Sequence, residues 1–195
     1  IKILHKLIHP ALDMAVKDRL IYNNVSDGCL KDYKDEGEKK YALTIEEKQE
    51  FLKRVEQKWG MYLPFVKFLF ASGVRLSEAI GLTWADVDES KGYIDINHQV
   101  QYRKISNKTI RYASKTKTSA GTRKIPITPE IKKILDEQRA IAKNIKIPVD
   151  YDVDGYKNFV FVSSGGKCIS HSSVQSMMRR LSRNTKKNDI KIRNV

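Results

Sequence analysis

One arginine in the chain stands directly after a glycine turn and between two apolar segments. Arg75 lies in the stretch ASGVRLSEAIGL, and Glu78 follows it three residues later. An arginine flanked by so much apolar sequence is expected to be partly buried and to need an anionic partner, which Glu78 provides on the same short helix. Because a guanidinium group binds two phosphate oxygens at once, an arginine held rigidly by Glu78 is suited to binding a phosphate. The alternative is a purely structural ion pair between Arg75 and Glu78.

Basic residues gather in two windows of the chain. The window from 101 to 129 has no acidic residue and contains Arg103, Lys104, Lys108, Arg111, Lys115, Lys117, Arg123 and Lys124. The window from 179 to 193 has one acidic residue, Asp189, and contains Arg179, Arg180, Arg183, Lys186, Lys187, Lys191 and Arg193. The formal net charge is +14, which favours nucleic acid over an anionic membrane surface as the partner. Windows of one sign predict phosphate contacts, with a flexible basic loop or a solvated helix face as the alternatives.

Other kinds of chemistry have little support in the sequence. It lacks a P-loop, a GxGxxG motif and an HExxH motif. His5 and His9 have the spacing of a metal-binding pair on a helix, but the sequence offers no third ligand nearby, so no metal site is predicted. Cys29 and Cys168 lie too far apart for a metal cluster or a disulfide framework, which favours a reducing intracellular compartment. No apolar run approaches the length of a membrane span, and no membrane partner is predicted.

The hydrophobic pattern predicts helices first, then a small antiparallel sheet, then helices, which is an α+β arrangement. An amphipathic helix is predicted over 1–22, with no partner for its apolar stripe in the residues that follow. The capping box Thr44–Glu47 predicts the start of a helix that reaches about residue 58. Further predicted helices cover 61–71, 76–82, 128–144 and a segment from 170 or 172 to 183. Predicted extended segments cover 93–100, 108–113, 123–127 and 159–162, with Gly121 at a hairpin turn.

The chain is predicted to contain parts of two domains. Residues 1–30 close a helical domain that begins before the chain does, because the chain lacks an initiator Met and its first helix lacks a partner. Residues 31–41 are nearly all charged and form an exposed linker. Residues 42–195 form the α+β domain.

Two stretches carry a specific resemblance to a known family. The stretch GVRLSEAIGLTWADVD resembles the first catalytic-arginine box of the tyrosine recombinases, the phage-integrase family. The stretch KTSAGTRKIP resembles the β-hairpin that carries the family's catalytic lysine. Residues 159–162 with the helix around 173–180 are similar to the segment before the second catalytic box, and residues 1–24 resemble the last helix of the core-binding domain. The overall similarity is greatest to integrases of conjugative transposons.

The resemblance implies a mainly helical catalytic domain and assigns roles to its residues. Arg75 would hold the scissile phosphate and stabilise the transition state, while Glu78 orients it. Lys117 would protonate the leaving 5′ oxygen, with Lys115 as the alternative. The reaction would cut and rejoin DNA through a 3′-phosphotyrosyl intermediate, without metal or cofactor, for excision and integration of a mobile element. The predicted DNA-binding residues are Arg103, Lys104, Lys115, Arg123, Lys124, Arg179, Arg180 and Arg183.

The resemblance also implies partners and a location. The expected partner is double-stranded DNA, with a dimer on each site and a tetramer on two sites, in the bacterial cytoplasm at the nucleoid. The family requires a later His-x-x-Arg-His box and a nucleophilic tyrosine, yet nothing after His171 fits and the last tyrosine is Tyr156. The chain is therefore expected to be an inactive fragment. The alternatives are a type IB topoisomerase-like enzyme and a DNA-binding protein without catalysis; an RNA-binding domain is disfavoured because the aromatic pattern of such domains is missing.

Overall fold

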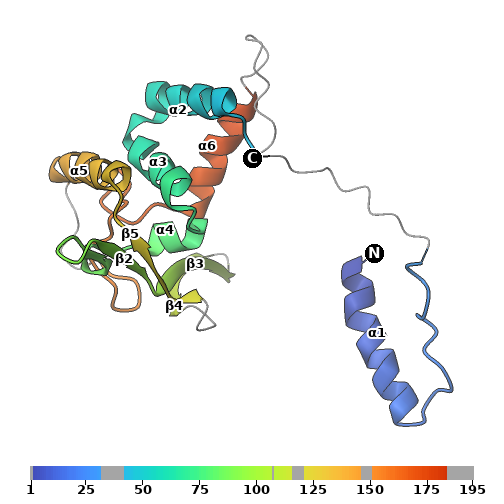
Figure 1. The fold of residues 1–195 in the computed structure, drawn as a ribbon. Coiled ribbons are helices and arrows are strands. Elements are labelled where there is room, and N and C mark those ends of the chain that lie inside the picture. The colour runs from blue at the N-terminus through green and yellow to red at the C-terminus, as the bar shows by residue number, and fades with distance from the viewer. Residues whose placement is uncertain (1, 32–41, 107, 116–120, 146–150, 184–195) are drawn as a thin grey trace. The chain divides into compact units, whose positions relative to one another are not determined.

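The computed structural model describes residues 2–31, 42–106, 108–115, 121–145 and 151–183. The chain divides into two compact units, Ile1–Lys40 and Tyr41–Val195, and each is described separately. Figure 1 shows the ribbon with its elements labelled.

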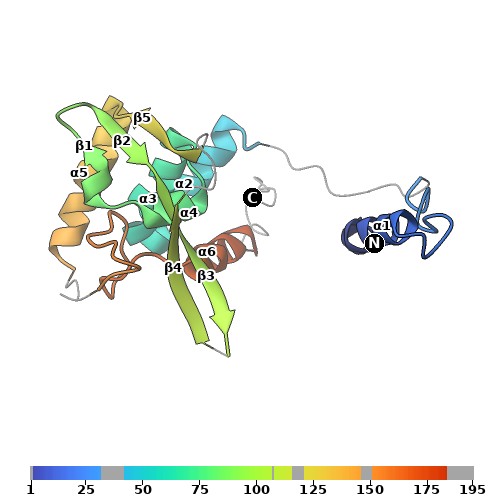
Figure 2. The same ribbon diagram turned by 90° about the horizontal axis from the view of Figure 1, so that it is seen from below.

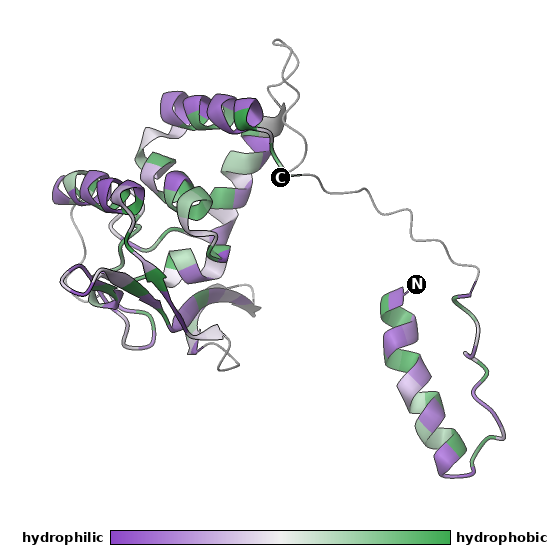
Figure 3. Cartoon of the chain, in the orientation of Figure 1, coloured by the Kyte–Doolittle hydropathy of each residue, from purple (hydrophilic) through white to green (hydrophobic). Residues whose placement is uncertain are grey.

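The first unit consists of helix α1, Lys2–Lys17, and a loop that returns along it. The loop is held by the buried side chain of Asn24, which donates to Oδ1 of Asp13 (2.7 Å) and to the carbonyl of His9 (3.1 Å). The helix predicted over 1–22 is thus amphipathic as expected but ends five residues earlier. Its apolar side chains, including Leu4 and Leu7, stay exposed among the described residues of this unit. Figure 3 shows hydrophobic and hydrophilic residues alternating along the helix.

The helices of the second unit begin and end at residues that the sequence marks. Thr44 and Glu47 form the predicted capping box at the start of α2, and Thr128 caps α5 by accepting from the amide of Ile131. Gly73 ends α3 in the left-handed conformation, with φ of 63°. The helices are α2 Ile45–Trp59, α3 Leu63–Ser72, α4 Leu76–Gly81, α5 Pro129–Lys143 and α6 His171–Arg183, with 3₁₀ turns η1 Gly60–Tyr62 and η2 Trp84–Asp86.

Two small antiparallel sheets complete the second unit, so the α+β prediction is confirmed. The three-stranded sheet has the order β1-β2-β5, and the two-stranded sheet pairs β3 with β4. The strands are β1 Val87–Asp88, β2 Tyr93–Ile96, β3 His98–Ile105, β4 Lys108–Lys115 and β5 Arg123–Pro126. Figure 2 shows the β3–β4 ribbon projecting away from the helices.

The strand pairing differs from the predicted hairpin with its turn at Gly121. The single strand predicted over 93–100 is broken at Asn97, whose side chain donates to Asp86. β4 pairs with β3, with Ile105 opposite Lys108, and β5 pairs with β2 instead. The turn lies at Ser106, where φ is 44°. β4 pairs with β3 and not with β5 because the connection from β3 to β4 is short. A two-residue loop closes this pair at a lower entropic cost than the longer loop from β4 to β5 would.

The core of the second unit lies between the helices and the extended run over 159–162. Phe161 packs on Phe65 and Phe68 of α3, with ring centroids 5.2 Å apart in each pair. The run is buried as predicted, but it makes only isolated bridges, Thr83 to Phe159 and Val162 to Cys168. Across the part of the chain that the structure describes, no helix is both long and apolar enough to cross a bilayer.

Candidate functional site

Helix α4 presents the arginine that the sequence singled out. The chain leaves α3 through Gly73, buries Val74, and places Arg75 at the N-cap of α4. Glu78 occupies the third helical position and turns its carboxylate back over the start of the helix, where it accepts from the backbone amide of Arg75 at 2.9 Å. This contact satisfies one of the amides that a helix N-terminus leaves without a partner in the helix.

The Glu78 carboxylate also holds two guanidinium groups. Arg75 Nη1 donates to Oε1 at 2.9 Å. Arg123, from β5, donates through Nη2 to Oε2 at 2.7 Å and through Nη1 to Oε1 at 3.2 Å. Glu78 is only 2% exposed, so these contacts lie largely out of water. One buried carboxylate thus fixes two arginines, Arg75 and Arg123, that are 48 residues apart in the sequence.

These contacts decide the charge state of Glu78. Burial alone opposes ionisation of the carboxyl group, but the hydrogen bonds from Arg123 and from the backbone and side chain of Arg75 outweigh it and lower the pKa of Glu78 to about 2. The same contact raises the pKa of Arg123. The cluster therefore holds one negative and two positive charges at neutral pH and retains a net positive charge.

The structure corrects the expectation that Arg75 is partly buried. Its side chain is 73% exposed, and the buried member of the pair is Glu78. The reason is the short length of α4, because Ala79 and Ile80 fill its inner face while the N-cap residue projects outward. Arg75 is therefore held in place by Glu78 while its side chain stays accessible to a ligand, which is the arrangement that a phosphate-binding arginine needs.

The other end of α4 is held by β3. His98 Nε2 lies 2.7 Å from the carbonyl oxygen of Gly81, and its ring stacks on Tyr156. Gly81 permits this approach, because a Cβ there would lie 2.9 Å from the backbone nitrogen of Val100. The sequence did not single out His98 or Gly81, since neither contact has a local pattern.

Of the two predicted catalytic lysines, the structure describes one. Lys115 is the last residue of β4, is exposed, and stands opposite His98 in the register. Lys117 lies outside the described residues. Arg103 on β3 and Lys124 on β5 are exposed, and Lys124 Nζ lies 4.1 Å from the Tyr93 ring centroid. Lys104 lies on β3, but its side chain is outside the described part.

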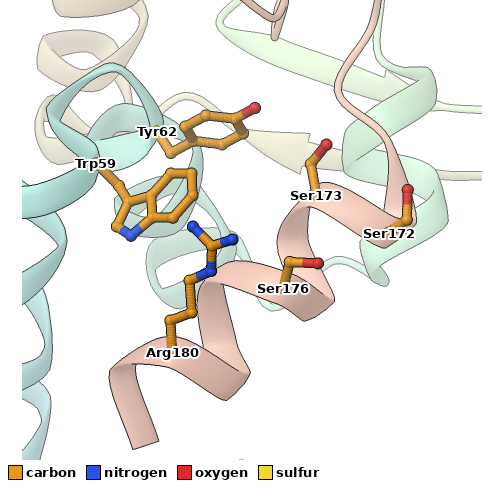
Figure 4. A pocket seen from close by; sticks show the side chains of 6 residues that line it. All are labelled: Trp59, Tyr62, Ser172, Ser173, Ser176 and Arg180. Carbon is orange, nitrogen blue, oxygen red and sulfur yellow. The ribbon is translucent and has the colours of Figure 1, made fainter. Parts of the chain in front are cut away.

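A pocket of about 240 Å³ lies between α6 and the end of α2, and it contains one of the predicted DNA-binding residues. Figure 4 shows Arg180 pointing toward Trp59, with its guanidinium carbon 5.7 Å from the ring centroid. Trp59 and Tyr62 form an aromatic wall, and the α6 side contributes hydroxyls from Ser172, Ser173 and Ser176. Arg179 is exposed on the same helix. Arg183 ends α6, and its side chain is not described.

His171 joins α4 to α6, a contact that the sequence reasoning missed. Its Nε2 lies 3.2 Å from the hydroxyl of Ser77 on α4, and its ring meets Tyr102 edge-on with centroids 5.7 Å apart. Burial lowers the pKa of His171. No sequence signal reveals this contact, because Ser77 and His171 lie 94 residues apart.

One group in the first unit has metal-ligand side chains close together. Candidate ligand atoms of His9, Asp13 and Asp27 lie within 4.8 Å of one another. His9 and Asp13 are already engaged, since Asn24 donates to Asp13 and the His9 ring contacts Ser26 Oγ at 2.8 Å. The arrangement is explained by the docking of the loop on α1, and His5 adds ring stacking on His9 rather than a fourth ligand to this group.

Comparisons with known proteins agree with this geometry. The model of the phage integrase family matches residues 42–193. The transposase from transposon Tn916 of Enterococcus faecalis is 27% identical over 172 residues, which are 86% of this chain and 41% of that protein. A XerC-like tyrosine recombinase of Caldanaerobacter subterraneus is 28% identical over 121 residues, 57% of this chain and 30% of its own length. The chain thus spans less than half the length of these curated relatives.

Solved structures show the same relationship. The Tn1549 transposon integrase in complex with a circular intermediate DNA superposes with a TM-score of 0.80 at 28% identity, covering 93% of this chain and 56% of that one. The XerA recombinase superposes at 0.51 with 16% identity over 78% of this chain and 46% of its own, a likeness of fold alone. Because the family model covers most of the sequence, including the whole Arg75–Glu78–Arg123 cluster, the chain belongs to the phage integrase family of tyrosine recombinases.

Proposed function

We propose that this chain is part of a site-specific DNA recombinase that cuts and rejoins strands for excision and integration of a mobile element. The observation that carries the proposal is Arg75, whose guanidinium is held by a buried carboxylate while its side chain as a whole remains 73% exposed. A preorganised, accessible guanidinium stabilises the charge that develops on a phosphate in the transition state without reorganising during the reaction. Within the phage integrase family, this is the role that the first arginine box implies.

The proposed reaction is a phosphoryl transfer that replaces the broken phosphodiester bond with a phosphotyrosyl bond and so keeps the bond energy for rejoining. A tyrosine oxygen attacks the scissile phosphorus, and the bond to the 5′ oxygen breaks. A lysine, Lys117 or alternatively Lys115, donates the proton that this oxygen takes up. The 3′-phosphotyrosyl bond is then attacked by the 5′ hydroxyl of another strand, which releases the tyrosine. Covalent catalysis divides strand exchange into two easier steps, so neither a cofactor nor a metal is required by this scheme.

Binding to duplex DNA is proposed for the basic residues of the β3–β4 ribbon, β5 and α6. The β3–β4 ribbon and β5 contribute Arg103, Lys104, Lys115 and Lys124, and α6 contributes Arg179, Arg180 and Arg183. Relatives support this assignment, since the Tn1549 integrase has been solved with transposon right-end DNA as well as with circular intermediate DNA. In this proposal the chain acts in the bacterial cytoplasm as a dimer on each site and a tetramer on two sites. Residues 1–30 end the core-binding domain, 31–41 form the linker, and 42–195 belong to the catalytic domain.

Covalent trapping on a nicked duplex tests the proposal. The nicked strand carries the candidate recombination site, and the chain is run beside the same chain extended past Val195. The readout is a protein–DNA adduct that survives denaturant, with the Arg75→Ala variant of the extended chain as the control. We expect an adduct from the extended chain and none from its Arg75→Ala variant.

Three results would redirect the proposal. An adduct formed by the chain ending at Val195 would mean that one of its own tyrosines is the nucleophile. Tight duplex binding with no adduct from either chain would favour the DNA-binding protein without catalysis. Relaxation of supercoiled DNA without exchange between two sites would instead favour the topoisomerase-like enzyme.

A further inference from the structure

Arg123 binds Glu78 through both ends of its guanidinium fork. Nη2 lies 2.7 Å from Oε2 and Nη1 lies 3.2 Å from Oε1. A bidentate contact fixes the plane of a carboxylate as well as its position, which a single hydrogen bond does not. The Arg123 side chain is 34% exposed, about half the exposure of Arg75, so much of its surface is used inside the protein.

The fixed carboxylate in turn determines where Arg75 lies. Oε2 accepts from the Arg75 amide and Oε1 accepts from its Nη1, both at 2.9 Å. Each carboxylate oxygen therefore serves one contact from Arg123 and one from Arg75. Because Glu78 is nearly fully buried, water competes little for these positions, and a rotation of the carboxylate would carry Arg75 with it.

Arg123 also stands at a junction of the chain. It opens β5, where it faces Ile96 of β2, and its Nη1 lies 3.4 Å from the carbonyl oxygen of Gly121. β3 begins two residues after Ile96 and holds the far end of α4 through His98. The six-residue helix α4 is therefore held at both ends. Glu78 near its start contacts Arg123 of the three-stranded sheet, and Gly81 at its end contacts His98 of the two-stranded sheet.

We propose that Arg123 is a positioning residue for the phosphate-binding arginine, fixing the carboxylate of Glu78 and thereby the guanidinium of Arg75. The inference rests on the proposed function and deepens it, because it gives Arg123 a task other than the direct DNA contact that its charge alone predicts. Arg123 also joins the strand that follows the lysine-bearing segment to the arginine box.

Arg123→Lys separates positioning from charge. Lysine keeps the positive charge and binds phosphate, but it lacks the planar fork that holds both oxygens of Glu78. Arg139→Lys is the matched control, since Arg139 makes another long-range pair with a glutamate, Glu89, away from the cluster. Both variants are made in the chain extended past Val195, and the rate of adduct formation is measured at saturating duplex together with the duplex Kd and the melting temperature.

We expect Arg123→Lys to form the adduct on the order of 10- to 100-fold more slowly, with a Kd within about 2-fold of the unchanged protein. Arg139→Lys should match the unchanged protein in both quantities. A normal rate with a weakened Kd in Arg123→Lys would overturn the inference and return Arg123 to the DNA contacts. If Arg123→Lys melts far below the unchanged protein, the double variant Glu78→Gln with Arg123→Gln, which leaves no unpaired buried charge, replaces it and is expected to show the same rate loss.

A carboxyl titration tests the inference without catalysis. In the chain ending at Val195, the ¹³C signal of the Glu78 carboxyl is followed with pH in the unchanged protein and in Arg123→Lys. We expect the Glu78 pKa to rise from about 2 when the fork is lost. An unchanged Glu78 pKa would show that Arg123 does not hold the carboxylate. If no form of the extended chain makes an adduct, the proposed function fails, while this titration still decides whether Arg123 fixes Glu78.

Discussion

The second unit has two sets of cationic side chains that differ in how firmly the protein holds them. The anchored pair, Arg75 and Arg123, shares one buried carboxylate from the start of α4. The exposed cations Arg103, Lys115 and Arg180 lie on the β3–β4 ribbon and on α6, and Arg180 rests against the Trp59 ring. Fixed side chains have lost their conformational freedom before a ligand arrives, whereas exposed ones lose it on binding. We therefore propose that the anchored pair serves the reacting phosphate, Arg75 by contact and Arg123 by positioning, and that the exposed cations serve affinity.

The largest expected effect comes from Arg75→Ala. Removing the more exposed arginine of the anchored pair should slow adduct formation by roughly 10³-fold or more, since the charge of the transition state loses its fixed partner. The duplex Kd should change by less than about 10-fold, because many exposed cations share the binding. Rate and Kd are measured on the nicked duplex with the chain extended past Val195. Equal losses in both quantities would show that Arg75 acts through structure or binding alone.

The next effect distinguishes the two lysines. Lys117→Ala should slow adduct formation by roughly 10²-fold, the lower end of what a general acid contributes, and Lys115→Ala by much less. A duplex with a better leaving group, a 5′-bridging phosphorothiolate, checks the role, because it needs no proton and should restore the rate of Lys117→Ala. If Lys115→Ala is the slower variant and is the one restored, the proton donor is Lys115.

The pH dependence of the free energy of unfolding tests whether the Glu78 carboxylate holds the anchored pair. The pKa of Glu78 is lowered from 4.5 to about 2 on folding, so the unfolded chain binds the proton more tightly than the folded chain does. The stabilisation is therefore fully present above about pH 4.5 and is lost as the pH falls toward 2, with a total on the order of 3 kcal/mol. Denaturant melts from pH 6 to pH 2 of the unchanged protein and Glu78→Gln measure it. The stability difference between the two should shrink in that window, and a constant difference would mean that Glu78 is not the titrating anchor.

The smallest effect belongs to a single exposed cation. Arg180→Ala should weaken duplex binding several-fold and reduce the slope of log K against log salt by about one, as expected for one lost phosphate contact. Binding is measured between 50 and 200 mM salt, with the unchanged protein giving a steep slope. A slope that does not change would assign Arg180 to the Trp59 pocket rather than to DNA.

Local patterns predicted the helices and the arginine box, and long-range contacts did not follow from them. The capping box at Thr44 and the glycine turn before Arg75, at Gly73, depend on neighbours within four residues, and both lie where the sequence placed them. Glu78 was predicted as the partner of Arg75 for the same reason. Arg123 appeared in the sequence only as one of many basic residues, because its contact with Glu78 joins segments 45 residues apart.

Two other predictions differ from the structure because they also depend on contacts that local patterns do not reveal. The exposure of Arg75 was predicted wrongly, since flanking apolar residues report which side of α4 is buried but not where its N-cap residue points. The hairpin was predicted at Gly121, whereas the short turn at Ser106 pairs β3 with β4. Composition and alternation identify strands, but the choice of partner depends on the competing loop lengths and on the buried faces of the whole domain.

The separation between catalysis and affinity is tested most directly by measuring adduct rate and Kd side by side for Arg75→Ala and Arg180→Ala. Both variants are made in the chain extended past Val195, and each rate is taken in a single turnover at saturating nicked duplex. We expect Arg75→Ala to lose far more in rate than in affinity, and Arg180→Ala to lose more in affinity than in rate. If both variants lose rate and affinity in the same proportion, the anchored pair and the exposed cations have the same role, which contradicts the proposed separation.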